Sequence, residues 1–200
     1  MTRTGLRIGL LGGSFNPAHD GHRHLSLVAL KRLGLDQVWW LVSPQNPLKA
    51  KRGMAPLADR LAHARQVAAH PCIRVTDLEV RLGTRFTVDT LSVLKRRFPQ
   101  HRFVWMMGAD NLRQLPGWDR WTELMQLVPV AVFDRAPYSW SVLTGQAGTR
   151  FRRFLWQQPE ARALAGATPP AWCFIRMKRH PMSATEVRAR GATPWPTDKP

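Results

Sequence analysis

Residues 12–22 read Gly12-Gly13-Ser14-Phe15-Asn16-Pro17-Ala18-His19-Asp20-Gly21-His22, and they are more informative than any other part of the chain. This stretch follows an apolar run at residues 6–11, which predicts a buried parallel strand, and it precedes residues 25–33, which predict a helix. A glycine-rich turn at such a junction places backbone N–H groups at the mouth of the helix, where the helix dipole favours an anion. His19 and His22, three residues apart, are expected to lie near each other on the first helical turn. The stretch therefore predicts a phosphate site with two imidazole donors, which indicates chemistry on a nucleotide.

Strand-like and helix-like segments alternate along the chain. Short apolar runs predict strands at residues 6–11, 37–42, 73–77, 102–107, 128–133 and 172–177. Amphipathic spacing and capping residues predict helices at residues 22–33, 57–69, 87–98, 119–127 and 183–190, with Thr87 as the N-cap of the third. The helical spacing of Phe151, Phe154 and Leu155 predicts a further surface helix within residues 151–165, and contact of this basic, apolar segment with a partner or a membrane surface is the alternative. The expected fold class is therefore α/β, with a doubly wound, mostly parallel sheet and helices on both faces.

Length and composition limit the class of protein. Two hundred residues fit one domain with a substantial core, expected over residues 1–190, and the proline-rich residues 191–200 are expected to be poorly ordered. No apolar stretch reaches the length of a membrane span, and residues 1–7 lack the apolar segment of a secretory signal, so a cytoplasmic protein is expected. Cys72 and Cys173 show no metal-binding spacing and are expected to be buried thiols.

The charge of the chain is strongly positive. Thirty Lys and Arg residues against thirteen Asp and Glu residues give a formal net charge of +17. Such a field attracts anions, which include nucleotides, nucleic acids and acidic membrane surfaces. Because most of the basic residues are arginines scattered along the chain, the pattern is typical of solvated faces rather than of one binding tract. A nucleic-acid-binding protein remains the less favoured alternative.

Two common nucleotide-binding signatures are absent from the sequence. It contains no G-x-x-x-x-G-K-[ST] motif, and no G-x-G-x-x-G follows the first predicted strand. In their place stands G-G-S-F-N-P-x-H-x-G-H. Gly12 and Gly13 would let the backbone approach a ligand where a Cβ would block it, and Pro17 would fix the path of the chain into the helix.

This segment resembles the signature of the nucleotidyltransferases that carry an HxGH motif, and more narrowly that of the bacterial nicotinate-nucleotide adenylyltransferases. Four further segments are similar to segments of that family, in the family's order, so the resemblance runs from residue 6 to about residue 190. They are Ser43-Pro44-Gln45-Asn46-Pro47-Leu48-Lys49, Phe86-Thr87-Val88-Asp89-Thr90-Leu91, Met107-Gly108-Ala109-Asp110-Asn111-Leu112 with Pro116-Gly117-Trp118, and Met182-Ser183-Ala184-Thr185-Glu186-Val187-Arg188. The resemblance implies a Rossmann-like fold. It also implies that ATP and nicotinate mononucleotide react to give nicotinate adenine dinucleotide and pyrophosphate, with Mg²⁺, in NAD biosynthesis.

The resemblance also implies roles for individual residues. The catalytic residues would be His19, His22 and Arg188. ATP and its phosphates would contact Gly12, Gly13, Ser14, Phe15, Lys49, Gly108, Ser183 and Thr185. Nicotinate mononucleotide would contact Thr87, Asp110, Trp118 and Arg135. No metal ligand is assigned, because the sequence shows no carboxylate cluster and Mg²⁺ can be held mainly by substrate phosphates and water.

The residues themselves are compatible with this chemistry. A phosphate monoester has a second pKa of about 6, so it is largely ionised at neutral pH and can attack without a general base. Ser183 and Glu186 have capping-box spacing, which predicts a second helix N-terminus, and Arg188 adds a planar double donor for pyrophosphate. Enzymes of the same fold that use nicotinamide mononucleotide or phosphopantetheine as the acceptor stay open. A homo-oligomer stays open as well.

Overall fold

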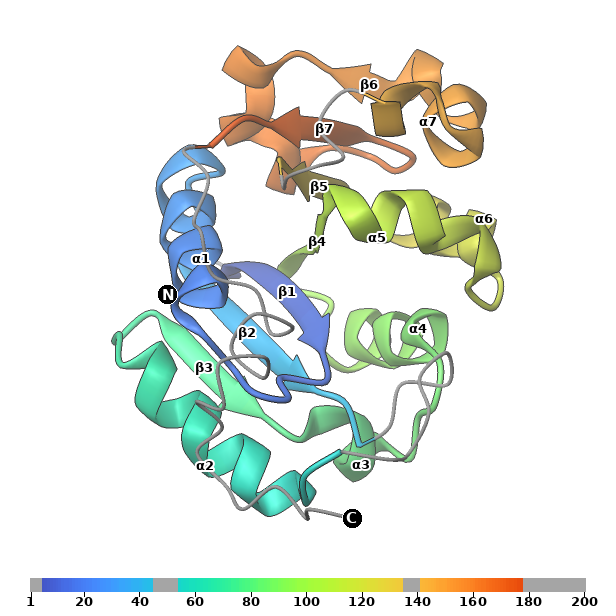
Figure 1. The fold of residues 1–200 in the computed structure, drawn as a ribbon. Helices are drawn as coiled ribbons and strands as arrows, with labels where there is room; N and C mark the ends of the chain where they lie inside the picture. The colour runs from blue at the N-terminus through green and yellow to red at the C-terminus, as the bar shows by residue number, and fades with distance from the viewer. Residues whose placement is uncertain (1–4, 45–53, 135–140, 178–200) are drawn as a thin grey trace.

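The structure is a computed structural model, and it describes residues 5–44, 54–134 and 141–177. Within these residues seven strands form one parallel sheet, in the order β3-β2-β1-β4-β5-β7-β6. The strands are β1 Arg7–Gly13, β2 Gln37–Val42, β3 Ile73–Thr76, β4 Arg102–Gly108, β5 Val130–Phe133, β6 Leu155–Trp156 and β7 Trp172–Ile175. The chain adds β2 and β3 on one side of β1 and then returns to add β4 on the other, so the strand order reverses between β1 and β4 (Figure 1).

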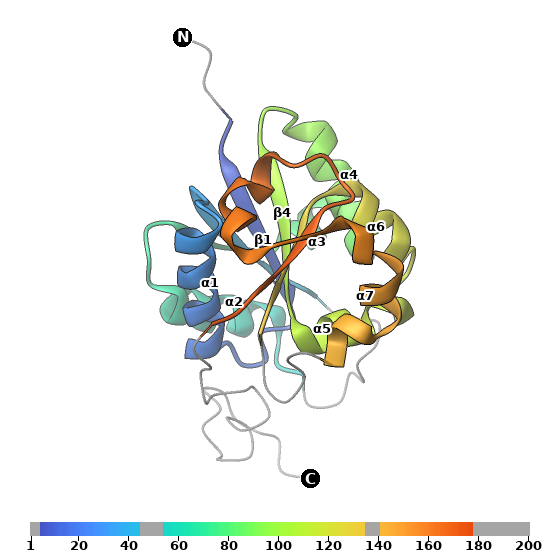
Figure 2. The ribbon, with the colours of Figure 1, turned by 90° about the horizontal axis from the view of Figure 1, so that it is seen from above.

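Helices cover both faces of this sheet. They are α1 Asp20–Arg32, α2 Leu57–Ala68, α3 Leu78–Leu82, α4 Thr87–Arg97, α5 Ala109–Gln114, α6 Trp121–Leu127 and α7 Gln146–Arg150, with the 3-10 helices η1 Leu115–Gly117, η2 Ser141–Thr144, η3 Arg152–Phe154 and η4 Gln158–Gly166. Figure 2 shows α1 and α2 on one side of the central strands, and α4, α5, α6 and α7 on the other. The prediction of an α/β, doubly wound, parallel sheet is confirmed.

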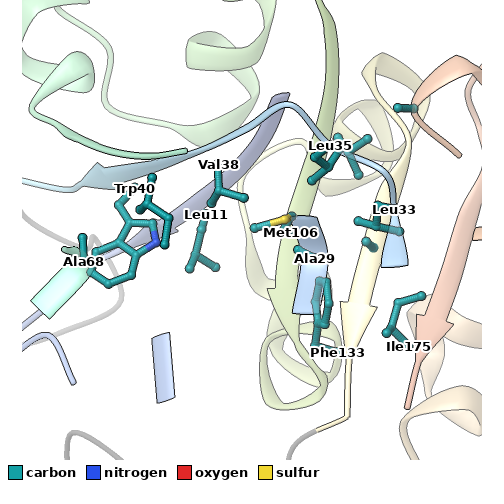
Figure 3. Packing of buried hydrophobic residues seen from close by; sticks show 14 of the residues in the cluster. Leu11, Ala29, Leu33, Leu35, Val38, Trp40, Ala68, Met106, Phe133 and Ile175 are labelled. Atoms are coloured by element: carbon teal, nitrogen blue, oxygen red, sulfur yellow. The ribbon is translucent and has the colours of Figure 1, made fainter. Parts of the chain in front are cut away.

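The side chains of β4 explain why the sheet is buried on both faces. Successive residues of a strand point to opposite faces, so a strand covered twice is apolar throughout. Phe103, Trp105 and Met107 pack with the residues of α4, α5 and α6, whereas Val104 and Met106 pack with those of α1 and α2. Figure 3 shows the second cluster, which runs from Ala68 and Trp40 at one end to Ile175 at the other.

The ends of α1 follow from its sequence. The helix begins at the two histidines of the motif, which cap it from both directions. It ends at Arg32, and Gly34 follows with a φ of 59°, a left-handed conformation that glycine adopts at low cost. Lys31 and Arg32 in the last turn complement the helix dipole. The predicted end of this helix near Gly34 is confirmed.

Several details of the sequence prediction differ from the structure. The short helices α3, α5 and α7 and the 3-10 helices η1 and η2 were not expected, and α6 begins two residues later than predicted. Thr87 is not the N-cap of α4, because Phe86 holds that position and Thr87 is the first helical residue. Cys173 is buried as expected, but Cys72 is partly exposed.

The predicted helix at residues 151–165 is wrong. This segment forms η3, the two-residue strand β6 and η4. Leu155 and Trp156 pair with Trp172 and Cys173 of β7, so the main chain bonds to the sheet instead of to itself. Pro159 then stands where a continuous helix would need a backbone N–H donor. The predicted helix at residues 183–190 and the tail at 191–200 lie outside the described residues.

A helix that spans a membrane must be both long and apolar. Within residues 5–44, 54–134 and 141–177, no helix meets both requirements.

We expect Trp40→Phe to lower the free energy of unfolding by about 1–3 kcal/mol. The indole N–H of Trp40 donates to Ser26 Oγ at 2.8 Å inside the core, and Ser26 Oγ in turn donates to the carbonyl of His22 at 2.9 Å. Loss of the indole donor leaves a buried hydroxyl with one hydrogen bond fewer. Urea unfolding of the wild type and the variant measures the change.

The matched control for this substitution is Trp39→Phe. Trp39 is the next residue of β2, and its indole N–H bonds to Gln37 in a part-buried position. Its loss should therefore cost less than the loss of the Trp40 donor. Equal losses in the two variants would contradict the role given to the Ser26–Trp40 bond.

Candidate active site

The candidate site lies at the point where the strand order reverses. The carboxyl ends of parallel strands meet at one edge of the sheet, and the connections from β1 and β4 leave this edge toward opposite faces, which opens a crevice between them. A cavity of about 430 Å³ occupies this position. Its lining residues are Gly12, Gly13, Ser14, Ser43, Glu79, Arg85, Phe86, Thr87, Trp105, Asp110, Asn111, Gln114, Gly117, Trp118 and Asp119.

The two histidines of the motif cap α1 reciprocally. His19 is the N-cap, and its Nδ1 accepts a hydrogen bond from the backbone N–H of Gly21 at 3.1 Å. The Nδ1 of His22 accepts from the backbone N–H of His19 at 3.2 Å. The two rings are tilted by 40° with their centroids 3.9 Å apart. The pair therefore begins the helix and forms one rigid unit with its first turn.

These bonds assign the tautomer of both rings. A neutral imidazole carries one N–H and one acceptor nitrogen, so a ring whose Nδ1 accepts holds its proton on Nε2. His19 and His22 each accept at Nδ1 from a backbone N–H. Each ring therefore holds its proton on Nε2, and the Nε2 of His19 is buried.

Aromatic packing holds this unit against the sheet. Phe15 is buried, lies 5.0 Å from Trp40 in a stacked arrangement, and contacts His22 at 4.8 Å between ring centroids. Its backbone has a φ of 46°, in the left-handed region, where an ordinary side chain adds strain. Phe15 was predicted to contact ATP. Its side chain packs in the core, and Phe15 does not line the cavity.

Gly12 has a packing role that the sequence did not show. A Cβ on Gly12 would lie 2.5 Å from the indole of Trp105, much too close, whereas a Cβ on Gly13 would make ordinary contacts of 3.4 Å with Phe15. Position 12 must therefore be glycine, because the ring of Trp105 leaves no room for a side chain there. Trp105 also forms part of the cavity wall. Gly13 and Ser14 line the cavity beside it.

The residues predicted to bind nicotinate mononucleotide lie together where the structure describes them. Thr87, Asp110 and Trp118 all line the cavity. Thr87 is the first residue of α4, whose first backbone N–H groups have no partner within the helix. Trp118 is half-buried and meets Trp105 edge to face at 6.4 Å, so it packs on the wall and also faces the cavity.

Other predicted residues do not line the cavity or are not described. Gly108 ends β4 as the N-cap of α5 and does not line the cavity. His19 and His22 follow Ser14 along the same loop and do not line it either. Five predicted residues lie outside the described residues: Lys49, Arg135, Ser183, Thr185 and Arg188.

The structure adds Glu79 to the site. This residue of α3 is only 7% exposed, and it lines the cavity. Burial raises the pKa of its carboxyl to about 7, and a hydrogen bond with Ser43 partly opposes this rise. No pattern in the sequence distinguishes Glu79, since one acidic residue in a short apolar segment is common on protein surfaces.

We expect the free energy of unfolding to fall between about pH 4.5 and about pH 7, where Glu79 ionises in the unfolded chain before it does in the folded one. Below the ordinary pKa of about 4.5 the carboxyl is protonated in both states. Between about 4.5 and about 7 the unfolded chain releases the proton and the folded chain keeps it, so the free energy of unfolding decreases with rising pH. Above pH 7 the loss is complete, at about 3 kcal/mol.

Glu79→Gln removes this titration and isolates its contribution. Urea unfolding at about pH 5 and about pH 8 compares the wild type with the variant. The variant should gain stability relative to the wild type at the higher pH, while the other titrating groups cancel in the difference. If the free energies of unfolding of the wild type and the variant differ by the same amount at both pH values, the pKa of Glu79 is not raised in the folded protein.

Comparison with known proteins gives one consistent family. Residues 10–190 match the model of the family described as cytidylyltransferase-like. A protein of Parvibaculum lavamentivorans named "Probable nicotinate-nucleotide adenylyltransferase" is 52% identical over 187 residues, which cover 94% of this chain and 93% of the relative. A relative of the same name from Bradyrhizobium sp. is 49% identical over 183 residues, which cover 92% and 95%.

A solved structure has a similar fold. The Plasmodium falciparum nicotinic acid mononucleotide adenylyltransferase complexed with NaAD superposes with a TM-score of 0.70 at 17% identity, covering 92% of this chain and 83% of that one. The Rossmann-like fold implied by the sequence is thereby confirmed. The identity of about one half to the curated relatives also confirms the resemblance on which the sequence analysis depended. The chain belongs to the cytidylyltransferase-like family and, within it, to the nicotinate-nucleotide adenylyltransferases, which are nucleotidyltransferases.

Proposed function

We propose that this protein joins ATP and nicotinate mononucleotide to give nicotinate adenine dinucleotide and pyrophosphate. The observation that carries the proposal is the capped pair His19 and His22, which begins α1 at the end of the loop whose residues Gly13 and Ser14 line the cavity at the reversal of strand order. The names of the curated relatives support the reaction, and the Plasmodium structure with NaAD supports the size of the product.

The reaction requires alignment and charge neutralisation more than acid–base chemistry. A phosphate oxygen of the mononucleotide attacks the α-phosphorus of ATP, the bond between the α-phosphorus and its bridging oxygen breaks, and pyrophosphate leaves with the electron pair. His19 and His22 donate N–H bonds to phosphate oxygens as charge develops on them. The main chain at Gly13 and Ser14 lies beside the same phosphates.

The opposite wall of the cavity suits the mononucleotide. Arg85, Phe86 and Thr87 line it at the start of α4, where the helix dipole favours an anion. A nicotinate carboxylate meets this requirement and a nicotinamide amide does not. Trp118 offers a ring face and Asp110 a carboxylate to the rest of the mononucleotide.

The residues outside the described part complete the proposal. Lys49 and Arg188 would neutralise the phosphates, and Ser183 and Thr185 would donate hydroxyl hydrogen bonds to the departing pyrophosphate. Arg135 would contact the mononucleotide. These roles derive from the family resemblance of the segments that contain them.

The described residues fit a divalent cation that arrives with ATP. They contain no group of three His, Cys, Asp or Glu side chains able to hold a metal. Mg²⁺ commonly keeps several waters and binds one or two carboxylates together with substrate phosphates, and Asp110 and Asp119 line the cavity. When bound, the ion would neutralise phosphate charge.

We expect His19→Asn and His22→Gln each to lower turnover by about a hundredfold or more, because each removes one imidazole donor to the phosphates. Asn is a good N-cap and Gln suits the third helical position of a capping box, so both variants retain the cap of α1. Release of pyrophosphate gives turnover, and thermal unfolding shows whether α1 survives. His24→Gln on the same helix is the matched control and should keep normal turnover. Near-normal turnover in both motif variants would refute the role of the pair.

The acceptor is tested by measuring pyrophosphate release with ATP, Mg²⁺ and one of three acceptors. Nicotinate mononucleotide should react fastest, because its carboxylate suits the N-terminus of α4. Nicotinamide mononucleotide should react more slowly and phosphopantetheine not at all. Equal rates with the two mononucleotides would overturn the nicotinate preference, and release with none of the three would overturn the enzyme activity itself.

A further inference from the structure

Arg60 is a buried cation that none of the roles above uses. It lies in α2, and its side chain is only 1% exposed. An arginine is rarely buried to this extent unless every donor of its guanidinium is satisfied, because desolvation of the charge is costly. Burial lowers the pKa of Arg60, but an arginine starts so high that it keeps its charge near neutral pH.

The guanidinium bonds to four main-chain carbonyl oxygens. Nε donates to Ala55 at 2.9 Å, one terminal nitrogen donates to Ser14 at 2.6 Å and to Ser43 at 2.7 Å, and the other donates to Pro44 at 3.0 Å. These oxygens come from three separate segments: the loop after β1, the end of β2 and the start of α2. One side chain thus ties together segments 46, 17 and 5 residues away in sequence.

Two of these segments form the wall of the candidate site. Ser14 and Ser43 both line the cavity. In a trans peptide the C=O and the following N–H point in opposite directions, so the bond from Arg60 to the Ser14 carbonyl directs the N–H of Phe15 away from the guanidinium. A carbonyl oxygen that pointed into the cavity would repel a phosphate. The hydrogen bond from Arg60 holds the carbonyl oxygen of Ser14 toward the guanidinium instead.

The neighbouring contacts support the same geometry. Asn16 accepts a hydrogen bond from the N–H of Ala55 at 3.1 Å, which adds a second tie between the loop after β1 and the start of α2. Ser43 donates its backbone N–H to Gly13 at 2.9 Å. Among the described residues, none of the ion pairs includes Arg60, so its charge also favours an anion in the cavity.

We propose that Arg60 is a positioning residue that sets the main chain at Ser14 and Ser43 for binding the triphosphate of ATP. The proposal rests on the proposed function, since it assigns ATP to this side of the cavity. It predicts a larger rise in the KM for ATP than in the KM for the mononucleotide, because the hydrogen bonds that the structure describes for Arg60 go to the loop after β1, the end of β2 and the start of α2.

The test compares Arg60→Lys, Arg60→Ala and the control Arg65→Ala, which removes an exposed arginine from the same helix. Lysine keeps the charge, but one ammonium cannot span four carbonyls. In Arg60→Lys the KM for ATP should rise about tenfold and kcat should fall on the order of a hundredfold, while the KM for the mononucleotide changes little. Arg65→Ala should behave as the wild type.

Chemical rescue separates positioning from general stability. Guanidinium ion at millimolar concentration should restore part of the turnover of Arg60→Ala, whereas urea, its neutral analogue, should not. If Arg60→Ala does not fold, the same comparison is made with Arg60→Lys. Parallel losses of ATP affinity, mononucleotide affinity and thermal stability without guanidinium rescue would overturn the proposal, as would normal kinetics in Arg60→Lys or failure of both variants to fold.

Calorimetric binding of a non-hydrolysable ATP analogue keeps this test apart from the proposed reaction. The wild type should bind the analogue without any acceptor, and Arg60→Lys should bind it about tenfold more weakly. Equal affinities would overturn the role of Arg60. A wild type that binds the analogue but releases no pyrophosphate with nicotinate mononucleotide would overturn the proposed acceptor and leave the result for Arg60 standing.

Discussion

The rest of the site depends on the two hydrogen bonds that His19 and His22 accept at the start of α1. Each bond satisfies a backbone N–H that would otherwise lack a partner, and each occupies the Nδ1 of an imidazole. The helix cap therefore decides where the ring protons lie. The same two rings thus begin the helix through Nδ1 and, in the proposed function, bind phosphate through Nε2, so an exchange of either histidine for an apolar residue would affect both.

Two layers of packing keep this unit in place. On one face of the sheet, Phe15 and Trp40 stack beneath His22, and the bond from Trp40 to Ser26 links β2 to the first turns of α1. On the other face, the indole of Trp105 lies so close to Gly12 that no side chain fits there. The end of β1 is therefore held between two aromatic residues, and the loop that follows begins from a fixed point.

The polar groups behind the cavity are arranged around Ser43. Its carbonyl oxygen accepts from Arg60, and its side chain shares a hydrogen bond with Glu79. Arg60 of α2 and Glu79 of α3, a buried cation and a buried acid, thus both form hydrogen bonds with Ser43. The cation stays charged and holds the main chain, whereas the acid is close to its titration point near neutral pH. The main chain of the cavity wall is fixed from behind, and the ligand-facing groups need little rearrangement on binding.

Much of the fold and the centre of the site could be predicted from the sequence, because their signals are local. The apolar runs of β1 and β4, and the motif between β1 and α1, can each be recognised from neighbouring residues in the sequence. The segment at residues 151–165 could not be predicted, because its pairing with β7 is a contact made across the sheet. The burial of Arg60 does follow from its spacing, because it lies on the same face of α2 as Leu57, Leu61 and Ala64. The burial of Glu79 does not, since it results from the packing of α3 against β2.

Helix capping sets the tautomer of both histidines, and NMR spectroscopy can detect that tautomer. A long-range ¹H–¹⁵N spectrum of protein labelled with ¹⁵N-histidine distinguishes a protonated ring nitrogen from an unprotonated one. At about pH 8.5, where an imidazole is ordinarily neutral, His19 and His22 should both show a protonated Nε2 and an unprotonated Nδ1. A proton on the Nδ1 of either ring would contradict the account, because that nitrogen could then not accept the backbone bond that begins α1.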